Sequence, residues 1–116
     1  MRRIILLAVG LVGLAAITLA VQQTYPNNTG EVVLENDRVV VQRFIVEPGQ
    51  WVGEHSHPGN QIAVILKGGE TTFREGGEER VETSEDGSVV WMEATEAHDH
   101  GNTGDNPIEL LVITLK

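Results

Sequence analysis

The chain has 116 residues, contains no cysteine and carries a formal net charge of −9. A chain of this length holds one small domain, which excludes a multidomain enzyme, and the lack of cysteine excludes disulfides, thiolate metal sites and a cysteine nucleophile. The acidic composition argues against a nucleic-acid partner, because nucleic-acid affinity comes largely from Lys and Arg side chains on phosphates.

The chain begins with a basic and then apolar segment. Arg2 and Arg3 precede a run from Ile4 to Val21 in which Thr18 is the only polar residue. This pattern is typical of a secretory signal peptide, which is cleaved, and of an N-terminal membrane anchor, which is retained. In both cases the arginines stay inside and the rest of the chain is exported. A buried core helix is the less favoured alternative, because such a helix usually carries a polar stripe.

We therefore predict a signal peptide or N-terminal membrane anchor over residues 1–21. The protein is expected to be periplasmic or otherwise extracytoplasmic, either cleaved and soluble or anchored by this hydrophobic helix, and to contact the membrane only through it. Residues 22–30 are polar and contain Pro26, Asn27 and Asn28, which predicts a linker before the domain.

Residues 31–116 have the pattern of a β-domain. Short runs rich in Val and Ile alternate with Gly, Asn and Asp, and no segment has a useful helical period. Many short strands of this kind predict an all-β sandwich or closed barrel. The predicted strands cover residues 32–34, 39–46, 61–66, 71–74, 79–83, 88–92 and 108–115.

The four histidines of the chain occur as two pairs with the same spacing, His55-Ser56-His57 and His98-Asp99-His100. Because side chains at i and i+2 of a strand share a face, each pair places two imidazoles side by side. This spacing suits two ligands of one metal ion. Surface or hydrogen-bonded core histidines are the alternative interpretation, and spacing alone does not decide between the two.

The residues around these pairs resemble the two sequence motifs of the cupin superfamily, in its small single-domain form. Gly49, five residues, His55-Ser-His57, three residues, Gln61, six residues and Gly68 are similar to the first motif, in which Glu is usual at the place of Gln61. Gly87, five residues, Glu93-Ala-Thr95, two residues, His98, three residues and Asn102 are similar to the second motif, in which Pro-x-Gly is usual at 93–95.

The resemblance implies a cupin-type double-stranded β-helix, or jelly-roll barrel, over residues 31–116. It further implies one divalent metal ion, with Fe, Ni, Zn, Cu and Mn all open, held by His55, His57, Gln61 and His98. Whether Gln61 ligates is left open, because three histidines alone can form the site. His100 is not a ligand in the family; it is expected at the pocket mouth or behind the ligands, with a shifted register in which it replaces His98 as the alternative.

A neutral amide in place of a carboxylate leaves a divalent site at net +2. Such a site favours an anionic ligand and is expected to bind Mn²⁺ less well than imidazole-preferring metals. The candidates for acid–base catalysis are Glu93, Glu96 and His100, with Glu93 and Glu96 on a loop before His98. Strand alternation directs Glu54 and Asp99 away from the metal, and for all these acidic residues a solvated surface position is the alternative.

Two function classes remain open on the sequence. The first is a small metalloenzyme, dioxygenase-, isomerase- or lyase-like, acting on a small oxygen-rich substrate. The second is a non-catalytic module that binds or senses a small ligand. A homodimer is expected in either case, because a small β-barrel without disulfides gains stability by burying a sheet edge.

Overall fold

The computed structural model describes residues 22–57 and 59–116, so the signal peptide or N-terminal helix predicted for residues 1–21 lies outside the described chain. Within these two ranges, no helix combines the length and the hydropathy that a membrane crossing requires. The regular structure of the described residues consists of β-strands, which confirms the predicted all-β class.

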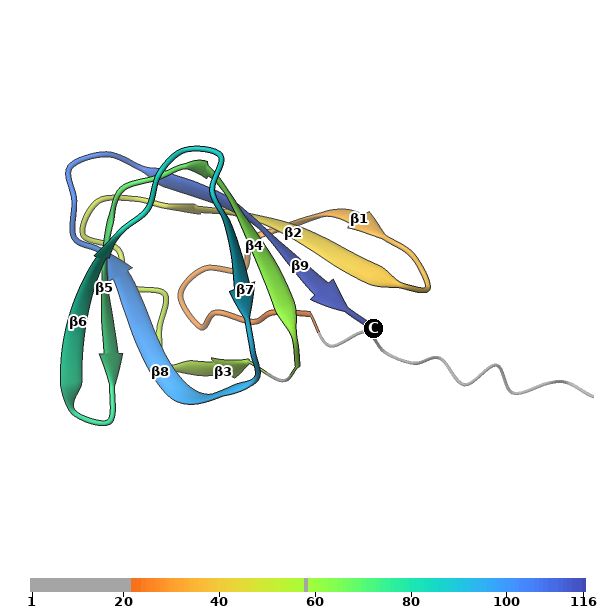
Figure 1. The fold of residues 1–116 in the computed structure, drawn as a ribbon, viewed down its shortest axis with the longest axis horizontal. Helices are drawn as coiled ribbons and strands as arrows, with labels where there is room; N and C mark the ends of the chain where they lie inside the picture. Colours follow the sequence, from red (N-terminus) through yellow and green to blue (C-terminus); the bar gives the residue numbers. More distant parts are fainter. Residues whose placement is uncertain (1–21, 58) are drawn as a thin grey trace, which may run out of the picture.

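Two antiparallel sheets pack face to face and enclose the interior of the domain (Figure 1). The larger sheet has the strand order β1-β2-β9-β4-β7, and the smaller sheet has the order β3-β8-β5-β6. Strands that are distant in the sequence are therefore neighbours, as in the pairs β2–β9 and β3–β8. The strands are β1 (Glu31–Glu35), β2 (Val39–Val46), β3 (His55–His57), β4 (Gln61–Lys67), β5 (Glu70–Glu75), β6 (Glu78–Thr83), β7 (Val89–Met92), β8 (Thr95–Asn102) and β9 (Ile108–Leu115).

The inward faces of β2, β4 and β9 form most of the core. β2 buries every second residue from Val40 to Val46, and β4 buries every second residue from Gln61 to Ile65. This alternation follows from the period of two along a strand. The buried apolar cluster consists of Tyr25, Phe44, Val46, Val52, Ile108 and Val112.

The predicted strands are confirmed within a few residues, whereas β3 and β8 were not predicted as strands. β3 has only three residues, and β8 is polar and contains Gly101, which lacks the side chain that a strand usually packs. Glu96 therefore lies on β8 and not on the loop expected before His98.

The segment interpreted as a linker contributes to the packed domain. Gln23 and Tyr25 are 2% and 4% exposed. The Gln23 N–H donates to Gln42 Oε1 (2.8 Å), and Gln42 Nε2 donates to the Gln23 carbonyl (3.0 Å). These reciprocal bonds tie residues 22–30 to the middle of β2, so the segment differs from the exposed connection that its composition predicted.

Candidate metal centre

Three histidines from two strands converge inside the barrel. β3 and β8 pair antiparallel, with His55 opposite His98, and His57 follows two residues later on the same face. One ring nitrogen of each of the three lies within 4.8 Å of the corresponding nitrogens of the other two. Each residue is 8% exposed. This arrangement confirms that imidazoles from the two motifs meet, and it could hold one metal ion.

Backbone carbonyls fix the orientation of two of these imidazoles. His55 Nδ1 lies 2.8 Å from the Gly53 carbonyl oxygen, and His98 Nδ1 lies 3.0 Å from that of Glu96. A carbonyl oxygen only accepts, so in each ring Nδ1 carries the proton and Nε2 keeps its lone pair. His55 Nε2 is buried and has no hydrogen-bond partner among the described residues. A histidine held by one nitrogen with the other left free is the usual state of a metal ligand.

The backbone that orients His55 is itself held by β8. The Gly53 N–H donates to Asp99 Oδ1 (2.9 Å). Asp99 therefore does not face the histidine cluster; its carboxylate fixes the residue whose carbonyl accepts from His55. Its role in the structure is to position a candidate ligand, and Glu54 is exposed on the other side of the strand.

Burial favours the neutral form of His55, His57 and His100. Desolvation, helped by the neighbouring imidazoles, lowers the pKa of His57 to about 4 and that of His100 to about 3. Desolvation also lowers the pKa of His55, although the Gly53 carbonyl opposes the shift. These rings consequently offer lone pairs at neutral pH without first losing a proton, which favours metal binding.

Gln61 is fully buried at the start of β4, in the sheet opposite the histidines. Its Nε2 donates to Thr114 Oγ1 (3.0 Å), which fixes the amide, while its Oε1 is buried without a partner in the described part of the chain. An amide oxygen is an acceptable ligand for a divalent ion. The free lone pairs of Gln61, His55 and His57 are the buried polar atoms that a bound cation would satisfy.

His100 lies beside the three-histidine group and is not a member of it. In the observed register it pairs with Phe73 of β5, while His98 pairs with His55. Its ring centroid is 5.1 Å from that of His55, and its Nδ1 is buried without a partner in residues 22–57 and 59–116. His100 lines the cavity in this register, while His98 is the residue that joins His55 and His57.

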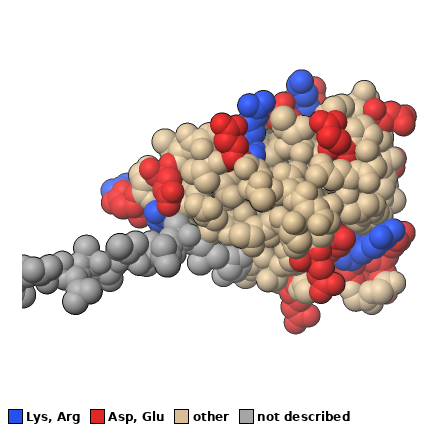
Figure 2. Space-filling view, turned by 180° about the vertical axis from the view of Figure 1, so that it is seen from behind, with Lys and Arg blue, Asp and Glu red and all other residues tan. Residues whose placement is uncertain are grey.

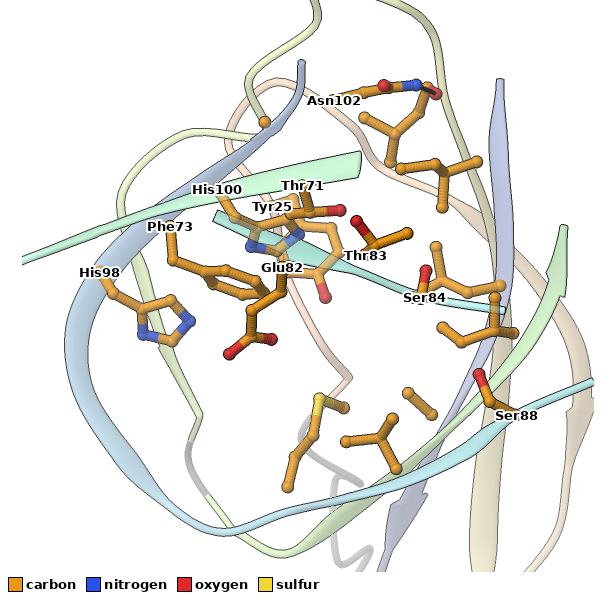
Figure 3. Close-up of a pocket in the computed structure, with 18 of the residues that line it drawn as sticks. Tyr25, Thr71, Phe73, Glu82, Thr83, Ser84, Ser88, His98, His100 and Asn102 are labelled. Carbon is orange, nitrogen blue, oxygen red and sulfur yellow. Dashed lines mark hydrogen bonds between the residues drawn. The ribbon is translucent and has the colours of Figure 1, made fainter. Parts of the chain in front are cut away.

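A cavity of about 470 Å³ adjoins the histidines. Figure 3 shows His98 and His100 on one side of it, with Ser84 and Ser88 on the far side. Of the three acid–base candidates, only His100 lines the cavity; Glu93 and Glu96 are exposed and do not reach its wall. Their catalytic role stays a prediction that the geometry does not favour.

Tyr25 is the site residue that the sequence did not indicate. Its ring contacts Phe44, His55 and His100, at centroid distances of 4.6, 4.5 and 5.4 Å. Burial raises the pKa of Tyr25 above its ordinary value. Tyr25 is the only tyrosine of the chain and stands in a polar stretch, so periodicity could not identify it; a lone aromatic residue there was the only available signal.

Comparisons with known proteins agree with this architecture. A cupin domain of *Bordetella pertussis* Tohama I has 20% sequence identity and a TM-score of 0.71, covering 82% of this chain and 99% of that chain. A conserved protein of *Klebsiella pneumoniae* with a double-stranded β-helix domain has 24% identity and a TM-score of 0.60, covering 81% of each chain. The polyketide cyclase RemF from *Streptomyces resistomycificus* has 18% identity and a TM-score of 0.63, covering 81% of this chain and 68% of that chain.

At these identities the structural matches show a shared fold only. No curated protein matches the sequence. The sequence profile described as Cupin domain (Cupin_2) matches residues 42–114, which include both histidine pairs and Gln61. This match covers more than half of the chain, and the chain therefore belongs to the cupin domain family.

Proposed function

We propose that this protein is an extracytoplasmic, metal-dependent cupin that acts on a small oxygen-bearing ligand. His55, His57 and His98 hold one divalent ion, and Gln61 supplies a fourth ligand. The observation that carries the proposal is the set of three buried imidazoles whose ring nitrogens lie within 4.8 Å of one another. The extracytoplasmic placement rests on the basic and apolar pattern of residues 1–21.

A bound divalent ion would supply Lewis-acid polarisation of an oxygen group on the ligand. The chain's own residues orient the imidazoles through Gly53 and Glu96 and exclude bulk water from them. Three or four protein ligands leave coordination positions open, and a cavity of about 470 Å³ adjoins them. These features favour an enzyme of the dioxygenase, isomerase or lyase type.

A non-catalytic ligand-binding or sensing module is the second candidate. One observation favours it: among the described residues that line the cavity the acids are Glu82 and Glu85, from β6 and the loop after it, and neither belongs to the strands that carry the histidines. Next to the three-histidine group, the lining residues that could act as a general acid or base are His100 and Tyr25.

Elemental analysis tests the metal site. The full-length chain, purified without chelators and without a histidine tag, is expected to hold about one divalent ion per molecule. His57→Ala and His98→Ala should lose most of it. His100→Phe is the matched control, because it removes a neighbouring imidazole outside the three-histidine group and should keep the metal. A wild-type chain that stays metal-free after incubation with Fe²⁺, Ni²⁺ and Zn²⁺ would contradict the proposal, as would equal loss in all three variants.

A further inference from the structure

The wall of the cavity has two chemically different sides. The four-stranded sheet contributes the imidazoles of His57, His98 and His100. The five-stranded sheet contributes aliphatic and thioether side chains. These apolar lining side chains include Val46, Ala63, Ile65, Val90, Met92 and Leu110. The division follows from strand alternation, because the inward positions of β2, β4 and β9 beside the cavity are apolar.

Uncommitted polar groups gather at the histidine side. Tyr25 lines the cavity beside His100, whose buried Nδ1 has no partner in the described chain. The serines on the far side are already used: Ser84 Oγ donates to the Gly69 carbonyl and Ser88 Oγ to the Glu85 carbonyl. Apart from the hydroxyls of Thr71 and Thr83 and the carboxylates of Glu82 and Glu85, a bound molecule therefore finds its hydrogen-bonding partners at the histidine side.

The charges of the cavity exclude a second anionic group on the ligand. Among the described residues that line it there is no Lys or Arg, and the charged lining residues Glu82 and Glu85 are both acidic. Away from the metal, a second carboxylate or a phosphate would lose its hydration without gaining a cationic partner, and the two acids would repel it.

We propose that the cavity binds an amphiphilic small molecule with a single oxygen headgroup and an uncharged, apolar body. The headgroup lies at the metal and the His100–Tyr25 side, and the body packs against β4, β7 and β9. This proposal rests on the proposed function, because the metal anchors the headgroup. The oxygen-rich substrate expected from the sequence is thereby narrowed to a molecule whose oxygen atoms lie at one end. Dicarboxylates and sugar phosphates do not meet this requirement.

A series of carboxylates with one shared headgroup tests the ligand class. Acetate, butyrate, benzoate and malonate are titrated into the Co²⁺-loaded full-length chain, and binding is followed by the visible absorption of the cobalt. Each methylene buried against the apolar wall is worth about 0.8 kcal/mol, or about fourfold in affinity. Butyrate, with two more methylenes, is therefore expected to bind about 15-fold tighter than acetate, benzoate at least as tightly as butyrate, and malonate no tighter than acetate.

Two arginine variants on β7, one facing the cavity and one facing away from it, test where the body of the ligand packs. Val90 lines the cavity and is 44% exposed, so Val90→Arg places a cation at the apolar wall without disturbing the core. It should raise the affinity for malonate relative to butyrate at least fivefold. Val89 precedes it, is 66% exposed and does not line the cavity, so Val89→Arg should behave as the wild type.

The possible failures are distinguishable. A chain that takes up no Co²⁺ overturns the proposed function. A Co²⁺-loaded chain that binds malonate most tightly, gains nothing from acetate to butyrate, or binds none of the four carboxylates overturns the ligand class and leaves the metal site standing. If Val90→Arg and Val89→Arg changed the affinity for malonate relative to butyrate equally, the ligand body would not pack against the inward face of β7.

Discussion

The first histidine of each pair is oriented in the same way. His55 donates to the carbonyl of Gly53 and His98 to that of Glu96, in each case two residues earlier in the chain. The proton is thereby held on Nδ1 and the lone pair on Nε2 faces the interior. At the scale of single residues, backbone carbonyls orient the imidazoles of the candidate site. The metal affinity of the site should therefore depend on how rigidly those carbonyls are held.

Asp99 tests this dependence. Asp99→Ala removes the acceptor of the Gly53 N–H and frees the backbone that orients His55, so the Zn²⁺ affinity should fall about 10-fold or more, as measured by competition with a chromophoric chelator. Asp99→Asn retains an oxygen acceptor and should stay within about threefold of the wild type. Glu54→Ala is the control at an exposed neighbour. If Asn were as harmful as Ala, Asp99 would act through its charge and not through positioning.

The depressed pKa values predict acid sensitivity of the metal-free protein. Imidazoles titrate near 6.5 in an unfolded chain, whereas the pKa of His57 is lowered to about 4 and that of His100 to about 3. The unfolded state therefore binds more protons throughout this interval, so the stability present above pH 6.5 is lost progressively as the pH falls. Between pH 7 and pH 5 we expect the free energy of unfolding to drop by about 2 kcal/mol for each of these imidazoles.

Urea denaturation of the full-length chain in the presence of a chelator measures this loss. His100→Phe keeps an aromatic ring beside Tyr25 and Phe73 and removes one titrating group, so the drop should be roughly halved. Stability that is constant from pH 7 to pH 5, or a drop that His100→Phe leaves unchanged, would contradict the account.

At the scale of secondary structure, the strands that form the scaffold could be predicted and those that carry the site could not. β2, β4 and β9 are rich in Val, Ile and Leu, and this pattern alone identifies them. β8 carries His98 and His100 in a polar sequence, and its Gly101 leaves room for Trp51, whose ring lies 2.5 Å from where a Cβ would stand. The extended conformation of β8 depends on pairing with β3 and β5, and these tertiary contacts cannot be read from the local sequence.

The histidines of the candidate site could be predicted from the sequence, whereas Tyr25 beside them could not. The resemblance to the cupin motifs implied that His55, His57 and His98 share one site, and the β3–β8 register explains how His98 reaches His55. No pattern in the sequence places Tyr25, because its burial depends on the Gln23–Gln42 hydrogen bonds that hold residues 22–30 against β2. Positions fixed by single long-range contacts leave no periodic pattern in a sequence.

At the scale of the whole molecule, acidic and basic side chains are mixed on the face seen in Figure 2, where Lys and Arg lie next to Asp and Glu. Ion pairs such as Arg43–Glu109 (2.6 Å) also join opposite charges in the described part of the chain. That the protein has no nucleic-acid partner stays a prediction from its net acidic composition. Most of the exposed large apolar side chains lie on the edge strands β1, β6 and β7. Edge strands are the natural places for a second copy of the chain to pair.

The β1 edge provides the test of the expected homodimer. Val32, Val33 and Leu34 are 43%, 48% and 52% exposed, so both faces of this edge strand present apolar side chains. Sedimentation of the full-length chain at micromolar concentration should show a dimer, and Val33→Lys should dissociate it. Val81→Lys, on the edge strand β6 of the other sheet, should leave it intact. A wild-type monomer would refute the expectation.

X-ray absorption spectroscopy of the Zn²⁺-loaded full-length chain measures the metal coordination most directly. Convergence of His55, His57 and His98 predicts a first shell with three imidazole nitrogens at about 2.0–2.1 Å. In His98→Ala the spectrum should retain two. A wild-type shell made of oxygen ligands with at most one imidazole would contradict the assignment of the metal to the interior of the barrel.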